Sequence, residues 1–222
     1  MTDEAMNCRW DAPRAFSASE LPVYQGKEQV SSGWLNKYML DYTLPDGTPK
    51  RYEAVSRKKA DAYGAVLESR AAEVRPDAVC VVGHTAQDEF LLIREFRFPL
   101  NAMCVAFPAG LIDPGEDVLE CADRELREET GFGLVRAEDG RPAQARVCVQ
   151  PGFSSLGMSD ECIAMVFAEV ERVGQPQTEA MEFIQTILLP RADIQRFLCE
   201  NRDPLSIRAQ LVLEMMAYRP FE

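Results

Sequence analysis

The stretch Gly110–Phe132, GLIDPGEDVLECADRELREETGF, combines a helical repeat with a high density of acidic residues. From residue 117 to residue 130, apolar residues recur at helical spacing, which predicts a helix with one apolar side. Gly131 follows directly, and glycine commonly ends a helix in a left-handed turn. Five of the ten positions 120–129 are Asp or Glu, so the predicted helix needs a physical reason to hold so many like charges.

Three of these carboxylates share one face of the helix. Glu128 and Glu129 follow Glu125 by three and four positions, and like charges at that spacing repel by a few tenths of a kcal/mol when solvated. The cost rises if they are buried, and a divalent cation removes it. Carboxylate oxygens suit Mg²⁺ or Mn²⁺. We expect Glu116 to reach the same cluster from the preceding loop, and Arg124 to hold one carboxylate in place.

The helix alone leaves a second interpretation equally open, which is a solvated acidic face. Glu120 and Asp123 are expected to be solvated in both cases. The bend at Pro108-Ala109-Gly110, together with Gly115 and Gly131, provides backbone features that a solvated face does not require. These features favour a metal site.

The composition excludes several classes of protein. The 222 residues are 46% hydrophobic and 27% charged, which suits a globular chain with a substantial core. The net charge of −12 repels phosphate backbones, so nucleic acid is not an expected partner. The chain has one histidine, His84, expected at a strand end, which argues against a histidine-based zinc site or a Ser-His triad.

Cysteine usage and the apolar pattern indicate a cytoplasmic location. Seven cysteines without a CxxC pair predict reduced thiols. The polar, acidic start MTDEAMNCRWDAPR does not resemble a signal peptide. No apolar stretch is long enough for a membrane-spanning helix, so no membrane association is expected.

Three segments are expected along the chain: a loosely ordered leader at 1–25, a small β domain with its linker at 26–72, and a main domain at 73–222. In the small domain, WLNKYMLDYTL and TPKRYEAVSR predict two strands joined by a Pro45-Asp46-Gly47 turn. Residues 58–75 are either a helix or a long linker.

The main domain is expected to place the acidic helix among several strands. Two short helices close the chain, the last with Asp203 as its N-cap and Pro204 as its first residue. This order predicts an α+β or α/β sandwich and not a regular βαβ repeat. The expected strands are 77–85, 89–98, 102–110, 145–150, 161–170 and 181–190.

At Gly110–Phe132 the chain resembles the complete Nudix box. The match consists of Gly110, five residues, Glu116, seven residues, Arg124-Glu125-Leu126, one residue, Glu128-Glu129, one residue and Gly131-Phe132. In that family the box forms a loop–helix–loop that binds Mg²⁺ and hydrolyses a diphosphate linked to a second group. The resemblance implies an α/β/α sandwich, here with a small N-terminal β domain.

The flanking segments resemble one subgroup, the ADP-ribose and nucleotide-sugar pyrophosphatases. REFRFPLNAMCVAFPAGLID (94–113), SSLGMSDECIAMVFAEV (154–170) and the N-terminal hairpin all match, so the resemblance runs from about residue 30 to residue 218. It implies hydrolysis of ADP-ribose or a related nucleoside diphosphate sugar to a nucleoside monophosphate and a sugar phosphate. It also implies a homodimer formed through the N-terminal domain. One departure is Ala106, at a position that is often acidic in the subgroup.

The resemblance also implies roles for individual residues. Glu161, in the loop after Gly157, would orient or deprotonate the attacking water, and Arg97 would hold the diphosphate. From the small domain, Arg57 and Trp34 would reach a partner's substrate for phosphate binding and base stacking. The metal ligands would be Glu125 and Glu129, completed by Glu116, Glu128 and the carbonyl of Ala109.

Ordinary roles remain open for several of these residues. Arg97 is also interpretable as an exposed strand arginine, Glu161 as a cap, Trp34 as a core or interface residue, and Arg57 as part of a solvated basic run. Alternatives for the whole chain are a UDP- or GDP-sugar pyrophosphatase, a non-catalytic nucleotide-sugar sensor, or a cap hydrolase. The complete acidic set argues against the sensor, and the net charge argues against the cap hydrolase.

Overall fold

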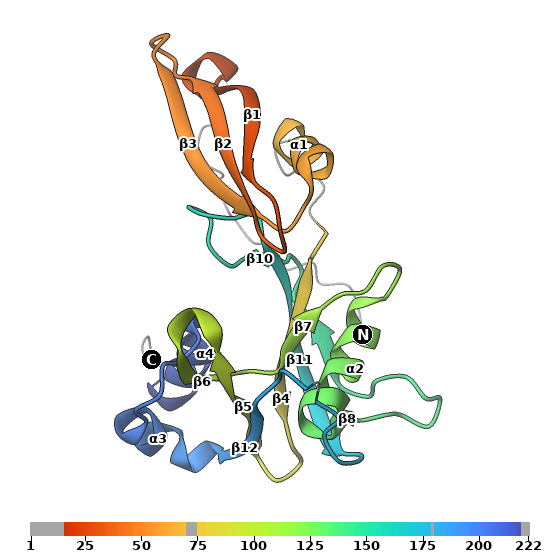
Figure 1. Ribbon diagram of the computed structural model, residues 1–222. Coiled ribbons are helices and arrows are strands. Elements are labelled where there is room, and N and C mark those ends of the chain that lie inside the picture. The colour runs from red at the N-terminus through yellow and green to blue at the C-terminus, as the bar shows by residue number, and fades with distance from the viewer. Residues whose placement is uncertain (1–15, 70–74, 179, 219–222) are drawn as a thin grey trace. The chain divides into compact units, whose positions relative to one another are not determined.

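The computed structural model describes residues 16–69, 75–178 and 180–218, which form two compact units (Figure 1). The first unit contains the described residues up to 69 together with Ser155–Asp160, and the second contains the rest. Each unit has a hydrophobic core of its own. No helix among the described residues is long and apolar enough to cross a membrane.

The first unit is a three-stranded antiparallel sheet with one helix. The predicted hairpin is confirmed, with Gly47 at φ 85° in its turn, as a tight reversal with positive φ requires. A further strand begins at Val23, inside the segment expected to be a leader, of which residues 1–15 lie outside the described part. The elements are η1 (Ala18–Glu20), β1 (Val23–Ser31), β2 (Asn36–Thr43), β3 (Pro49–Ser56) and α1 (Ala60–Glu68), with strand order β1-β2-β3.

The core of the first unit is small and aromatic. Tyr38 on β2 and Tyr63 on α1 pack with ring centroids 4.7 Å apart, together with Leu40 and Ala54. The segment that the sequence left as helix or linker is therefore a helix over residues 60–68, because it supplies part of this core.

The second unit contains a nine-stranded mixed sheet in which β11 and β4 are parallel and the other pairs are antiparallel. Its central order is β10-β11-β4-β5-β12, with β6 on β5, β7 on β4, and β8 and β9 on β11. The strands are β4 (Ala78–His84), β5 (Glu89–Arg97), β6 (Ala102–Ala106), β7 (Ala109–Leu111), β8 (Phe132–Leu134), β9 (Ala145–Val147), β10 (Gly152–Phe153), β11 (Cys162–Arg172) and β12 (Ile184–Pro190). The helical elements are η2 (Phe98–Leu100), α2 (Val118–Thr130), η3 (Arg191–Asp193), α3 (Ile194–Glu200) and α4 (Ile207–Tyr218).

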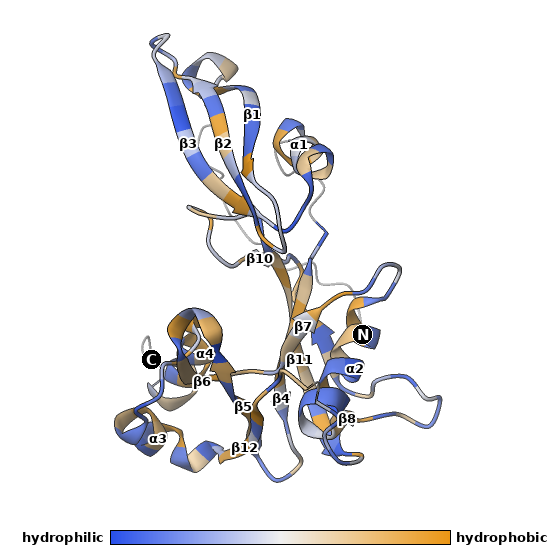
Figure 2. Ribbon diagram, in the orientation of Figure 1, coloured by the Kyte–Doolittle hydropathy of each residue, from blue (hydrophilic) through white to orange (hydrophobic). Residues whose placement is uncertain are grey.

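Both faces of this sheet are covered by helices. Along β4, Cys80 and Val82 pack with residues of α3 and α4, whereas Val79 and Val81 pack with residues of α2. This alternation follows from the two-residue period of a strand, and it explains why β4 is apolar at nearly every position (Figure 2). The predicted α/β/α sandwich with a small N-terminal β domain is confirmed.

The acidic helix begins and ends where the sequence predicts. Asp117 is its N-cap and accepts a 2.8 Å hydrogen bond from the Leu119 N–H, while Glu120 accepts one from the Asp117 N–H. Gly131 ends it at φ 73°.

The last helix differs from its prediction. α4 begins at Ile207, and the Ser206 hydroxyl accepts a hydrogen bond from the Ala209 N–H. The expected cap at Asp203 is wrong, because that carboxylate instead pairs with Arg94 on β5 at 2.6 Å. Asp203 therefore pairs with Arg94, a residue distant in the sequence, and does not cap the helix as the local pattern predicted.

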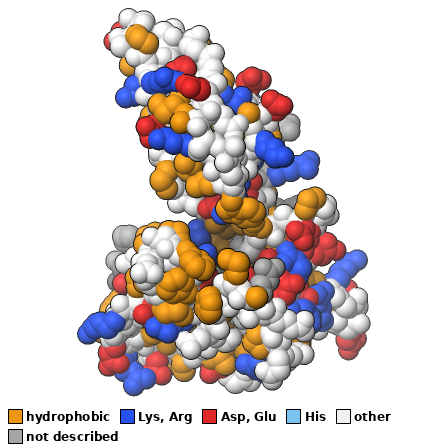
Figure 3. All heavy atoms as spheres, viewed as in Figure 1, with side chains coloured by type: hydrophobic (Ala, Val, Ile, Leu, Met, Phe, Trp, Pro, Cys, Tyr) orange, Lys and Arg blue, Asp and Glu red, His pale blue; other side chains and the backbone are white. Residues whose placement is uncertain are grey.

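One side of α4 is exposed and apolar. Ala209 and Leu213 are fully buried against the sheet, whereas Ile207, Leu211 and Met215, four positions apart, are exposed. Hydrophobic side chains accordingly gather on the surface over β6 and α4 (Figure 3).

Candidate active site

The bend before the acidic helix brings a backbone carbonyl and a carboxylate together. Ala109 and Gly110 begin β7, which pairs with β4 and so is fixed to the centre of the sheet. The carboxyl group of Glu125 lies directly against the backbone of Gly110, where any added Cβ would overlap it. Glycine is therefore required here for close approach of a side chain.

Glu129 is buried beside this bend. It is 5% exposed and accepts a 3.2 Å hydrogen bond from the Ala109 N–H. Burial raises the pKa of Glu129 well above its usual value, and the negative charges of Glu125, Glu95 and Glu182 raise it further. Burial likewise raises the pKa of Glu125, despite its pairing with Arg124. Such buried, mutually repelling carboxylates favour a bound cation.

Arg124 ties the other carboxylates of the helix together. Its guanidinium donates to Glu116 at 2.8 Å, to Glu125 at 2.7 Å and to Glu128 at 3.1 Å, and also to the carbonyl of Leu111. These bonds from Arg124 lower the pKa of Glu116 to about 2, and the carboxylates in turn raise the pKa of Arg124. Arg124 thus holds Glu116 in its ionised form, and its bond to Glu125 opposes the burial that raises the pKa of that carboxyl group.

The atoms around the bend that could ligate a metal are carboxylate and carbonyl oxygens, which suit a hard divalent cation. The close approach of Glu125 to Gly110 places a carboxylate next to the Ala109–Gly110 backbone. The described residues contain no group of three acidic, histidine or cysteine side chains placed to hold a metal ion. Three of the carboxylates form ion pairs with Arg124 instead. The residues around the bend therefore fit a divalent metal ion chemically, and Glu129, which accepts from the Ala109 N–H, is outside the set that Arg124 binds.

A cavity of about 230 Å³ lies beside the bend. Ala109 and Glu129 line it from the box, and Arg97 lines it from the end of β5. The Arg97 side chain is half exposed and pairs with Glu95 at 2.5 Å. The structure therefore brings Arg97, predicted to hold the diphosphate, to the acidic helix.

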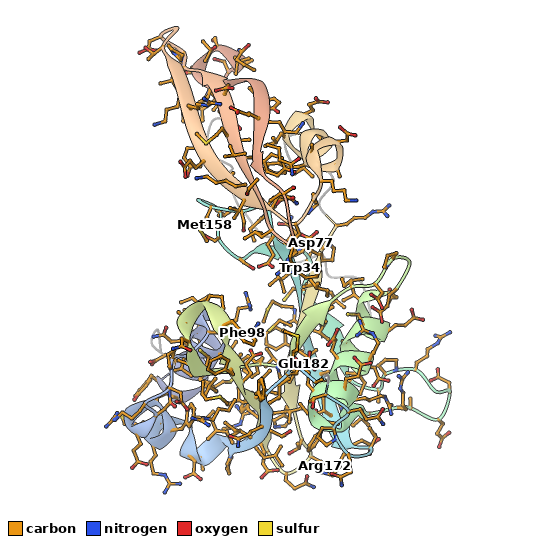
Figure 4. The ribbon with its side chains drawn as sticks, in the orientation of Figure 1. Trp34, Asp77, Phe98, Met158, Arg172 and Glu182 are labelled. Atoms are coloured by element: carbon orange, nitrogen blue, oxygen red, sulfur yellow. The ribbon has the colours of Figure 1, made fainter. Side chains whose placement is uncertain are left out.

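Glu182 is a site residue that the sequence interpretation missed. It lines the same cavity, and its negative charge contributes to the raised pKa of both Glu125 and Glu129. Its side chain is labelled in Figure 4. The available signal was an acidic residue two positions before the first residue of the apolar strand β12, but nothing in its spacing connects it to the box.

Glu161 lies at another level of the sheet. Strand register aligns Ala109 with Cys80 and Cys80 with Met165, and Glu161 precedes Met165 by four residues. At 3.3 Å per residue, Glu161 lies about 13 Å along the strand direction from the level of Ala109. Its carbonyl accepts a hydrogen bond from the Ser154 N–H. The structure does not bring Glu161 to the cavity that Glu182 lines.

The two candidates from the small domain lie together in the first unit. The Arg57 guanidinium stacks 5.4 Å from the centre of the Trp34 ring. Trp34 is 74% exposed, so it is not part of that unit's core.

The expectation that Asp123 is solvated is wrong. Asp123 was expected to be solvated but is 8% exposed, and it accepts hydrogen bonds from the Leu134 N–H at 2.7 Å and from Arg127 and Arg136. Burial alone would raise the pKa of Asp123, but these bonds outweigh it and hold the pKa below the ordinary value.

Ala106, the residue at the position that is often acidic in the subgroup, is buried at the end of β6.

Fold and site together define a class of protein: an α/β/α sandwich in which a loop–helix–loop carries a set of carboxylates. A family model described as NUDIX domain matches residues 74–208, more than half of the chain, and the chain belongs to this family. Proteins of this kind generally need a divalent metal ion.

Relatives match most of the chain. It is 28% identical over 197 residues to an ADP-sugar pyrophosphatase of Mus musculus, covering 86% of this chain and 82% of the relative. It is 26% identical over 193 residues to an ADP-ribose pyrophosphatase of Bacillus subtilis, covering 86% and 89%. The crystal structure of an ADP compounds hydrolase matches the fold with a TM-score of 0.67 at 22% identity, covering 89% of this chain and 93% of the other.

Proposed function

We propose that the protein hydrolyses the diphosphate bond of ADP-ribose or a related nucleoside diphosphate sugar with Mg²⁺, giving a nucleoside monophosphate and a sugar phosphate. The observation that carries this proposal is the complete acidic set of the box, with Glu125 against Gly110 and Glu129 buried beside Ala109. The names of the relatives point to the same substrates.

In this proposal the box residues hold the metal and Arg97 holds the diphosphate. Bound Mg²⁺, or Mn²⁺ on the same oxygens, acidifies water and polarises the phosphoryl oxygen. Glu125, Glu129 and the Ala109 carbonyl would be its main ligands, completed by Glu116 and Glu128. Arg124 orders Glu116, Glu125 and Glu128, because it donates to all three, and it holds Glu116 in its ionised form.

Two glutamates are candidates to orient or deprotonate the attacking water. The family resemblance proposes Glu161, and the cavity lining favours Glu182, since it shares that cavity with Glu129. Glu161→Gln and Glu182→Gln separate them: the variant that lacks the base loses about 10²–10⁴-fold in kcat. Glu171→Gln, at the far end of β11, is the matched control and should retain full activity.

The direct test is to incubate the pure protein with ADP-ribose and Mg²⁺ and to measure AMP. A panel of UDP- and GDP-sugars tests the alternative specificity in the same assay. Glu129→Gln should abolish turnover without unfolding the protein. Tight binding of these compounds without cleavage would identify a sensor and overturn the proposal.

We also propose that the first unit forms a homodimer in which Trp34 and Arg57 reach the partner's substrate. The exposed, paired Trp34 and Arg57 support a binding role. Light scattering should give the mass of a dimer, and Trp34→Ala should raise KM for ADP-ribose while that mass is unchanged. The six free cysteines among the described residues support a reducing, cytoplasmic location.

A further inference from the structure

The cavity beside Ala109 extends beyond the box toward exposed aromatic residues. Its walls come from residues 95–99 at the end of β5, from the box, and from residues 181–184 before β12. Because Ala109 and Glu129 form part of the wall, a diphosphate held at the box leaves one of its two attached groups in or next to this space.

The outer rim of the cavity is apolar and open to solvent. Phe98 is 61% exposed, Phe183 59% and Met181 73%, although all three lie around one cavity. The ring plane of Phe96 makes an angle of 87° with that of Phe98 and of 82° with that of Phe183. Both rim residues therefore pack edge-to-face with Phe96. Apolar rims around a few polar groups are typical of ligand sites. These rings offer separate apolar faces and do not form one flat stack.

The inner wall offers hydrogen-bond acceptors. Glu95 is 7% exposed, and its buried Oε1 lies 2.5 Å from the Arg97 guanidinium. No donor in the described part of the chain makes a well-aligned hydrogen bond to that Oε1. Glu182 lines the same space. An ionised carboxylate only accepts, so a matching ligand must present donors.

The hydroxyl groups of a sugar match this wall better than a nucleobase does. Hydroxyls donate, and the C–H faces of a sugar ring pack on separate aromatic residues, whereas a base edge also carries acceptors that carboxylates repel. We propose that this cavity binds the sugar attached to the diphosphate, and that Glu95 selects it by accepting hydrogen bonds from its hydroxyls. This inference rests on the proposed hydrolysis of nucleoside diphosphate sugars.

The test compares three substrates: ADP-ribose, ADP-glucose with the same base, and IDP-ribose with the same sugar. Glu95→Gln should change the ADP-ribose to ADP-glucose ratio of kcat/KM by about tenfold or more, as expected for lost hydrogen bonds to a charged group. The ratio of ADP-ribose to IDP-ribose should stay within about twofold. Phe183→Leu, which keeps an apolar side chain, should shift the sugar ratio in the same assay. Glu89→Gln, at the other end of β5, is the control and should change neither ratio.

The assay distinguishes failure of sugar recognition by Glu95 from failure of the proposed hydrolysis. An equal loss on all three substrates would mean that Glu95 only positions Arg97, and a changed base ratio would assign the cavity to the nucleobase; either result overturns the inference while hydrolysis stands. If the wild-type protein cleaves none of the substrates, the proposed function itself fails. If Glu95→Gln does not fold, the Phe183→Leu ratios decide.

Discussion

The substitution Gly110→Ala tests the geometry of the site with a single methyl group. A Cβ at this position would overlap the whole carboxyl group of Glu125, which lies against the backbone here. That carboxyl group is the free end of a flexible side chain, so the overlap is relieved by turning Glu125 away and not by moving β7. We therefore expect a cost to folding of about 1 kcal/mol, the low end of the range for an overpacked site.

The same displacement should have a much larger effect on the metal. If Glu125 is a ligand, turning it away should weaken Mn²⁺ binding by about 10–100-fold or more, the loss typical of disturbed ligand shells. Mn²⁺ binding is measured by electron paramagnetic resonance without substrate, thermal unfolding reports stability, and AMP release from ADP-ribose reports turnover. Gly152→Ala is the control, because an added Cβ there contacts nothing within 4 Å. Wild-type Mn²⁺ affinity in Gly110→Ala would refute the placement of Glu125 as a ligand at this bend.

Two predictions concern stability. Asp123→Asn should lower the free energy of unfolding by about 1–3 kcal/mol at pH 7. Because the pKa of Asp123 is depressed in the folded state, its stabilisation is present above the ordinary aspartate pKa of about 4 and is lost as pH falls through the folded-state value. Urea unfolding at pH 7 and pH 3 should show a smaller gap between wild type and variant in acid, and an unchanged gap would contradict this. Asn36→Ala should destabilise the first unit by about 2 kcal/mol, because buried Asn36 donates to the carbonyls of Ser56 and Lys58; amide exchange that is unchanged in β2 and β3 would contradict it.

Local features of this chain were predictable because their causes lie within a few residues. Asp117 and Gly131 bound the acidic helix, and the Pro45-Asp46-Gly47 turn sets the hairpin, through contacts that span one turn of chain. The spacing of Glu125, Glu128 and Glu129 likewise follows from helix geometry alone. These short-range rules, with the box resemblance, predicted the sandwich and the acidic cluster.

The strand β1 and the start of α4 were not predictable in the same way. β1 has a mostly exposed pattern without strict alternation, so it becomes a strand only by pairing with β2. Asp203 fits a cap by local pattern, but the ion pair with Arg94 on β5 takes its side chain. Segment Ser155–Asp160 joins the first unit through a 2.9 Å hydrogen bond from the Val55 N–H to the Met158 carbonyl.

The sequence by itself thus determined the acidic helix, its caps and the family of the chain, since each depends on residue type at fixed spacing. Only the tertiary structure decided which charges are solvated and which meet. In the folded protein Asp123 is buried and accepts hydrogen bonds from Leu134 and Arg136. Glu95 and Glu182 lie close enough to Glu129 for their charges to raise its pKa. Those encounters depend on strand register and on how the chain closes around the sheet, and burial then decides how strongly the carboxylates repel one another and favour a cation.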